Sequence, residues 1–141
     1  MSDKWDKHFI NLAIQHAQLS KDPSTKVGAI IVGPDRELIS GGFNGFPRGI
    51  EDTEERLNNR DLKLKFIIHA EMNAVLAAAK LGIKIKNCTM YVVCQSCDGN
   101  LWGGCCSTCT KHLIQSGLKE VISISTDNIP EKWQKDLELA K

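Results

Sequence analysis

The chain has 141 residues, of which 42% are hydrophobic and 25% are charged, and its 18 Lys and Arg nearly balance its 17 Asp and Glu. This length and composition predict one globular domain over residues 1–141 and exclude a disordered chain, and the longest apolar runs are too short to cross a membrane. The near-zero net charge also argues against nucleic acid as a partner, because neutralising phosphates requires a basic surface.

The first half of the chain predicts a helix, a hairpin and a long loop. Apolar residues recur at helical spacing from Trp5 to Ala17. Two extended segments over residues 27–32 and 37–42, joined by a Gly-Pro-Asp turn, predict a hairpin whose first strand is buried on both faces. We expect residues 43–61 to form a loop in which the charged run 51–56 is solvated. The functional alternative for that run is contact with a magnesium-bound nucleotide or with another subunit.

The second half of the chain alternates helices with strands. The predicted elements are a helix over residues 69–80 that ends at Gly82, a strand over 89–93, an irregular insertion over 94–104, a helix over 107–116, a strand over 118–125 and a helix beginning at Pro130. Helices that alternate with strands after an initial hairpin predict an α/β fold with three layers, α/β/α, around a mixed central sheet.

The residues at the amino terminus indicate the compartment. They carry mixed charges and no apolar segment, so they do not form a secretory signal. We therefore expect a cytoplasmic protein, whose thiols stay reduced. In that setting the six cysteines indicate metal ligands or catalytic groups before disulfides.

A histidine and a Cys-x-x-Cys pair stand at the predicted starts of two helices. They are His69 and the pair Cys106 and Cys109. The free amides of a first helical turn stabilise thiolates. One imidazole and two thiolates give zinc three protein ligands and leave one position open, which is typical of a catalytic site. A redox role for the Cys-x-x-Cys pair is less favoured, because it does not follow a first strand.

Glu71 lies two residues after His69, close to the same helix start. Zinc lowers the pKa of a bound water from 15.7 to about 7 and so provides a hydroxide nucleophile at neutral pH. Attack on a ring carbon that carries an amine also needs a group that moves the proton of the water to the ring nitrogen and the departing amine. Glu71 is the candidate for this proton shuttle.

His-x-Glu followed by Cys-x-x-Cys resembles the signature of the zinc deaminases. Four segments also resemble the deoxycytidylate (dCMP) deaminase family of the cytidine deaminase superfamily. They are SKDPSTKVGA at residues 20–29, GFNGFPRG at 42–49, HAEMNA at 69–74 and IQSG at 114–117. The resemblance implies a cytidine-deaminase-like fold and deamination of dCMP to dUMP, which feeds thymidylate synthesis. It also implies zinc held by His69, Cys106 and Cys109, with Glu71 as the proton shuttle.

The same resemblance implies a substrate site. Asn44 resembles the family's asparagine that hydrogen-bonds the sugar and orients the base, and the backbone amide of Ala70 would meet the cytosine carbonyl. Lys26, with Ser20 and Lys21 nearby, is a candidate for the 5′-phosphate, because a dianion needs cationic or hydroxyl donors.

Regulation and assembly are implied in the same way. The family contains members controlled by dCTP and dTTP, for which residues 42–49 would carry the effector site. Mg²⁺ would accompany such a nucleotide. Because the family forms dimers to hexamers, we expect a homo-oligomer.

The cysteine cluster departs from the family pattern. Cys105 replaces the proline that precedes the first cysteine ligand, and the segment before it is enlarged. Either the pair Cys106 and Cys109 is intact, or Cys97 is the first thiolate ligand and Cys109 the second. The two-residue spacing of the intact pair favours the first alternative.

The remaining thiols suggest a second metal site. Cys94, Cys97 and Cys105 are candidates for a structural zinc, with Cys88 or His112 as a fourth ligand.

Other functions remain open beside the deamination of dCMP. A deaminase of the same chemistry could act on dCTP, cytidine or a modified dCMP, whereas the neutral charge argues against a tRNA adenosine deaminase. A structural zinc module, from a different class, would keep the cysteines but would not need Glu71.

Overall fold

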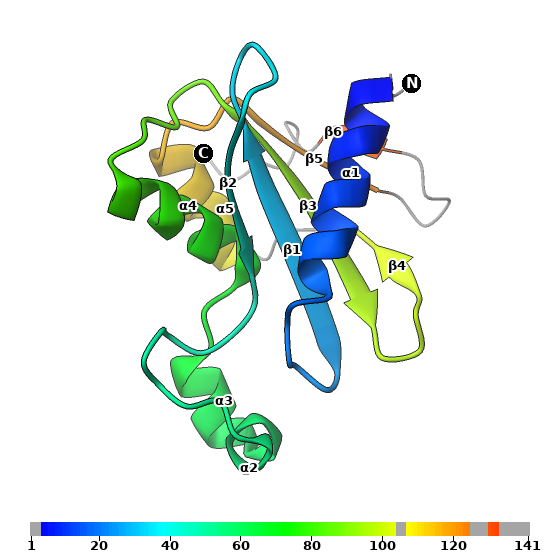
Figure 1. The fold of residues 1–141 in the computed structure, drawn as a ribbon, viewed down its shortest axis with the longest axis vertical. Coiled ribbons are helices and arrows are strands. Elements are labelled where there is room, and N and C mark those ends of the chain that lie inside the picture. The colour runs from blue at the N-terminus through cyan, green and yellow to red at the C-terminus, as the bar shows by residue number, and fades with distance from the viewer. Residues whose placement is uncertain (1–3, 104–106, 125–129, 133–141) are drawn as a thin grey trace.

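The computed structural model describes residues 4–103, 107–124 and 130–132 of the chain (Figure 1). Its elements in chain order are α1 (Lys4–Ala17), β1 (Thr25–Val32), β2 (Leu38–Phe43), α2 (Glu54–Asn58), α3 (Arg60–Phe66), α4 (Ala70–Leu81), β3 (Thr89–Ser96), β4 (Leu101–Trp102), α5 (Ser107–Gln115), β5 (Glu120–Ile124) and β6 (Pro130–Lys132). Within these described residues no helix is long and apolar enough to span a membrane.

The strands form one mixed sheet in the order β2-β1-β3-β5-β6, and β4 pairs with the end of β3. The β1–β2, β1–β3 and β5–β6 pairs are antiparallel, whereas β3 and β5 are parallel. Helix α1 covers one face of the sheet, and α4 and α5 lie over the other (Figure 1). The predicted three-layer α/β/α architecture is therefore confirmed.

Alternation along β1 and β3 creates a separate core on each face of the sheet. Ile30, Val32, Tyr91 and Val93 pack with Phe9 and other residues of α1. Their neighbours along the strands point the other way, because successive side chains alternate. The second core contains Ala29, Ile31, Met90 and Val92 from the strands and Ala70, Ala74 and Leu113 from the helices. The predicted burial of the first strand on both faces is confirmed.

Two glycines let helices lie directly on the strands. A Cβ at Gly28 of β1 would come within 1.9 Å of the Ala13 carbonyl oxygen of α1. A Cβ at Gly42 of β2 would lie 2.4 Å from both the Ala70 oxygen and the Ala74 nitrogen of α4. A Cβ at either position would collide with the backbone of the helix. The two glycines therefore determine how closely each helix approaches the sheet.

Three sequence predictions about local structure are wrong. The charged run is not a simple loop, because α2 begins within it, where the Thr53 side chain accepts the Arg56 N–H at 3.2 Å as an N-cap. The insertion is not irregular throughout, since β3 extends to Ser96 opposite Thr25 and then turns back through β4. Pro130 begins strand β6 rather than a helix, because pairing with Ile124 of β5 outweighs the local helical pattern. The predicted continuation of that helix over residues 133–141 lies outside the described residues.

The close approach at Gly28 predicts a specific loss of stability. Gly28→Ala should lower the free energy of unfolding by about 3 kcal/mol or more, because the new methyl group meets helix backbone that cannot move away. Gly45→Ala is the matched control, since a Cβ there would meet nothing closer than the Phe43 ring at 3.9 Å. Urea denaturation of both variants measures the difference. Equal free energies of unfolding for the two variants would contradict the close packing of α1 on Gly28.

Candidate metal centre

His69 and Cys109 come together at the starts of two helices. His69 precedes α4 in an extended conformation, with φ −68° and ψ 151°, and its side chain does not cap the helix. Cys109 lies near the start of α5 and is 2% exposed. The distance between His69 Nδ1 and Cys109 Sγ is 3.2 Å.

This spacing fits a shared tetrahedral metal. Zinc–sulfur and zinc–nitrogen bonds of about 2.3 and 2.0 Å at a tetrahedral angle place the two ligand atoms about 3.5 Å apart. Cys106, the third predicted ligand, lies outside the described residues. Among the residues that are described, no group of three His, Cys, Asp or Glu side chains could hold a metal. Cys97 is described and forms no such group with His69 and Cys109.

Glu71 lies beside this centre in the first turn of α4. Its side chain is buried, with 4% of the residue exposed. It faces Cys94 of β3: burial, and then the nearby Glu71 carboxylate, raise the pKa of the Cys94 thiol to about 12. A carboxylate in this position is shielded from solvent and close to the helix start that carries His69.

The start of α4 is held against the end of β2. The backbone of Ala70 packs on Gly42, and Asn73 Nδ2 donates to the Phe43 carbonyl at 2.7 Å. Ala70 is itself fully buried and is the first residue of the helix, where backbone N–H groups have no partner within the helix. The predicted role of its amide in binding a base is compatible with this position.

Asn44 follows β2 directly and is buried. Its Oδ1 accepts the Val27 N–H at 2.8 Å, and its Nδ2 donates to the Thr25 carbonyl at 2.9 Å and to Asp22 Oδ2 at 3.3 Å. The amide therefore holds the beginning of β1 and the segment before it. Its predicted contact with a sugar is not tested by these bonds.

The segment before β1 contains functional candidates that the sequence analysis missed. Asp22 is 5% exposed and pairs at 2.9 Å with Lys63 Nζ of α3. Burial raises the pKa of the Asp22 carboxyl, but hydrogen bonds from Lys63, Ser24 and Thr25 outweigh this and lower it below its usual value. The Asp-Pro-Ser sequence signals a turn that could have pointed to Asp22, whereas a helical lysine such as Lys63 gives no signal.

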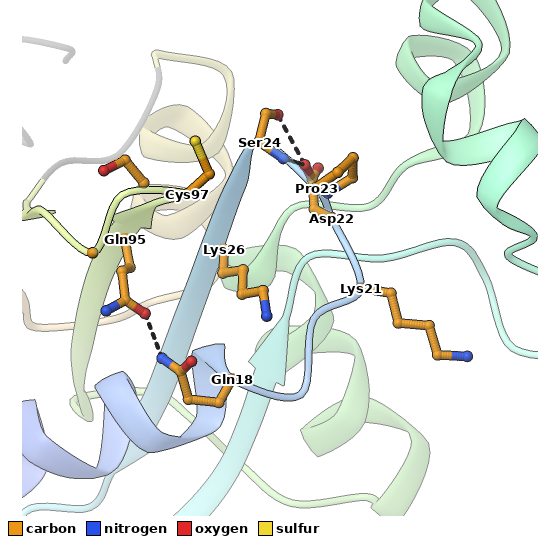
Figure 2. Close-up of a pocket in the computed structure, with 10 residues that line it drawn as sticks. Gln18, Lys21, Asp22, Pro23, Ser24, Lys26, Gln95 and Cys97 are labelled. Atoms are coloured by element: carbon orange, nitrogen blue, oxygen red, sulfur yellow. Dashed lines mark hydrogen bonds between the residues drawn. The ribbon is translucent and has the colours of Figure 1, made fainter.

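Lys26 is not brought together with the metal centre. It pairs with Gln95 across β1 and β3, and both side chains point to the α1 face, whereas Cys94 and Glu71 lie on the α4 face. Lys26 lines a pocket of about 470 Å³ at the end of the sheet. In Figure 2 it extends between the hydrogen-bonded Gln18 and Gln95 and the segment that carries Lys21.

The two neighbours of Lys26 in the phosphate prediction have other contacts. The Ser20 hydroxyl donates to the Asn44 carbonyl at 2.9 Å and is buried. Lys21 lines the same pocket, but its ammonium pairs with Asp52 at 3.1 Å. Ser20 is thus part of the structure around Asn44, and Lys21 is turned toward Asp52 rather than toward Lys26.

The predicted second zinc gains no support from the described cysteines. Cys94 is buried in the sheet as a thiol of raised pKa, and Cys97 is exposed in the turn after β3. Cys88 is six residues from Cys94 along an extended strand, which separates them by about 20 Å. Cys105 lies outside the described residues, so the site stays a prediction.

Comparison with known proteins connects this site to a family. A family model described as the cytidine and deoxycytidylate deaminase zinc-binding region matches residues 3–125. The chain is 37% identical over 129 residues to the deoxycytidylate deaminase of Mus musculus, an alignment that covers 86% of this chain and 65% of the relative. The chain thus spans somewhat less than two thirds of the length of that relative.

Solved structures show the same fold. The dCMP deaminase of the cyanophage S-TIM5 in its apo form superposes with a TM-score of 0.72 at 25% identity, covering 99% of this chain and 94% of the phage chain. A second structure of the phage enzyme, in complex with dCMP and dUMP, has a TM-score of 0.73 at 24% identity and the same coverage.

The two registrations of the cysteine ligands predict different metal contents. Cys106→Ala should lose the zinc that Cys97→Ala retains, because the two-residue spacing of Cys106 and Cys109 suits a shared metal and Cys97 forms no metal-binding group with His69 and Cys109. Zinc per chain, measured by atomic emission on reduced protein, decides between them. Loss of this zinc in the Cys97 variant alone would make Cys97 the ligand.

Proposed function

The chain belongs to the deoxycytidylate deaminase family of the cytidine deaminase superfamily, whose matched region binds zinc, and we propose that it hydrolyses dCMP to dUMP and ammonia. The observation that carries this proposal is the arrangement of His69, Glu71 and Cys109. His69 Nδ1 lies 3.2 Å from Cys109 Sγ, and the buried Glu71 lies in the first turn of the helix that follows His69. A structural zinc module would have no need of a buried carboxylate at this place.

His69, Cys109 and Cys106 would hold the metal. The chemistry that zinc supplies when bound is a lowered pKa of a water molecule, to about 7. The two ligands that are described lie about as far apart as tetrahedral coordination requires.

Glu71 would carry the protons of the reaction. The carboxylate takes a proton from the attacking water and delivers protons to the ring nitrogen and to the departing amine. A new C4–O bond replaces the C4–N bond, so that dCMP and water become dUMP and ammonia. Because Glu71 is buried, bulk water competes little for these protons.

Two further groups would orient the nucleotide. The Ala70 amide at the start of α4 would donate to the cytosine carbonyl, and Asn44 would hydrogen-bond the sugar. Both are held at the same end of the sheet, Ala70 by Gly42 and Asn44 by the Asp22–Thr25 turn.

The 5′-phosphate would enter the pocket lined by Lys26. Asp22 both lines this pocket and contacts Asn44, so the pocket adjoins the proposed sugar contact. Lys26 is half-buried, and no ion pair engages it among the described residues. A half-buried ammonium without a carboxylate partner favours an anionic ligand. By binding the 5′-phosphate, this pocket would distinguish dCMP from cytidine and deoxycytidine, which lack one. The alternative substrates that remain are dCTP and a modified dCMP.

Assembly and regulation complete the proposal. Ile50, Leu64 and Phe66 expose apolar side chains on and beside the α2–α3 segment, which supports a homo-oligomer. The segment around Gly49 is open, with φ +88° and no atom within 4 Å of a Cβ, which leaves room for dCTP or dTTP with Mg²⁺ at residues 42–49. A structural zinc at Cys94, Cys97 and Cys105 would be a second metal.

Removal of the Glu71 carboxylate should stop the chemistry without removing the metal. Glu71→Gln should reduce ammonia release from dCMP by about 10²- to 10⁴-fold, the usual contribution of a general acid–base group. Glu54→Gln on exposed α2 is the control. Release is measured in parallel from dCMP, dCTP, cytidine and deoxycytidine, together with zinc content. No release from any of the four by the unchanged chain would refute the enzyme proposal.

Replacement of Lys26 should change selectivity rather than turnover. Lys26→Gln should raise KM for dCMP about 10-fold or more, because a charge-assisted hydrogen bond to phosphate contributes about 1.5–3 kcal/mol. KM for deoxycytidine, which has no phosphate, should stay the same. Lys80→Gln, at an exposed position on α4, is the matched control. Equal rises for both substrates would argue against phosphate binding at this pocket.

A further inference from the structure

Asp22 is the centre of a buried polar cluster between α1 and β1. Its carboxylate accepts hydrogen bonds from three segments of the chain. The donors are Lys63 Nζ at 2.9 Å to both oxygens, the Ser24 N–H and hydroxyl at 2.9 Å each, the Thr25 N–H at 3.1 Å and Asn44 Nδ2 at 3.3 Å. One carboxylate thus shapes the turn before β1, contacts the end of β2 and binds α3.

Lys63 reaches this cluster from a part of the chain that otherwise packs little. Helices α2 and α3 project from one end of the sheet (Figure 1). No residue of α3, which is described throughout, is buried. Among the described residues, two ion pairs nevertheless link α3 and the segment just before α2 to the turn before β1. The Lys63 and Asp22 side chains are 19% and 5% exposed, whereas those of the Lys21–Asp52 pair are 68% and 34% exposed.

The orientation of the Asn44 amide depends on the charge state of Asp22. Asn44 Nδ2 can donate to Asp22 Oδ2 only while that oxygen is an acceptor. Lys63 contacts the same oxygen and supplies the cation that keeps the buried carboxylate ionised. Without Lys63 the carboxylate would be a buried charge without a cation, a costly state that favours uptake of a proton. A proton on Oδ2 would turn a hydroxyl donor toward the Asn44 amide group and weaken the hydrogen bond that holds it in place.

We propose that Lys63 is a positioning residue for the deamination, acting through Asp22 on the Asn44 amide and on the Ser24 side of the pocket that Lys26 lines. This inference rests on the proposed function, because it assigns Asn44 to the nucleotide. Lys63 itself need not touch the substrate. Its effect falls on how well the nucleotide is held rather than on the proton transfer, since Lys63 binds Asp22 and Ser24, and Asp22 in turn binds Asn44.

The test compares the two ion pairs that join the same segments. Lys63→Gln should raise KM for dCMP about tenfold, with kcat within twofold and zinc content unchanged, because coupling between contacting residues has this size. Lys63→Arg, which restores a cation, should return KM toward the original value. Asp52→Asn removes the exposed pair and should leave both constants unchanged. Thermal unfolding of each variant shows that the protein remains folded.

The outcomes separate the inference from the function on which it rests. If the unchanged chain releases no ammonia from dCMP, the proposed function fails and the inference fails with it. If the chain is active but Lys63→Gln leaves KM unchanged, or lowers kcat and stability alone, only the inference is overturned. If Lys63→Gln does not fold, Asp22→Asn is used in its place. The amide oxygen of the new residue can still accept from Ser24 and Thr25, but its NH2 group replaces the oxygen that accepts from Asn44. The same rise in KM is then expected, and an unchanged KM overturns the inference.

Discussion

The absence of a side chain at Gly42 is the constraint on which the site depends. Because β2 has no Cβ there, the backbone of α4 lies against the strand at Ala70 and Ala74, and the first turn of the helix stays at the end of the sheet. That contact places His69 where its imidazole meets Cys109 of α5, and it buries Glu71 between the helix and β3. The proposed metal ligands and the proposed proton carrier are thus positioned by one close packing of backbone on backbone.

A second constraint acts on the turn that precedes β1. The turn before this strand is held by the buried carboxylate of Asp22. The desolvation cost of this charge is offset by Lys63 and by backbone N–H donors. The Asn44 amide joins this turn to the end of β2. The end of the sheet that carries the proposed metal ligands therefore also carries a buried cluster of hydrogen-bonded polar groups, which suits the proposed recognition of a polar nucleotide.

Predictions from the sequence succeeded where one local signal dominated. Periodic apolar residues located α1, a high density of helix-forming residues located α4, and Gly82 in a left-handed conformation ended α4 as expected. They failed where two signals competed. The charge of the run around Thr53 predicts a solvated loop, but a threonine followed by acidic residues also favours a helix start. Pro130 also favours a helix start, but pairing with β5 decides its conformation.

The sequence by itself indicated the family and the proposed chemistry, because His69, Glu71 and the cysteines have the spacing of the zinc deaminase signature. Such groups can be recognised because a metal site uses few residue types in short motifs. Only the tertiary structure decided which distant residues act together. Lys26 and Glu71 fall on opposite faces of the sheet because side chains alternate along a strand. Lys63 binds Asp22, which stands 41 positions earlier in the sequence. No sequence pattern shows where the charged end of such a long, flexible side chain will lie.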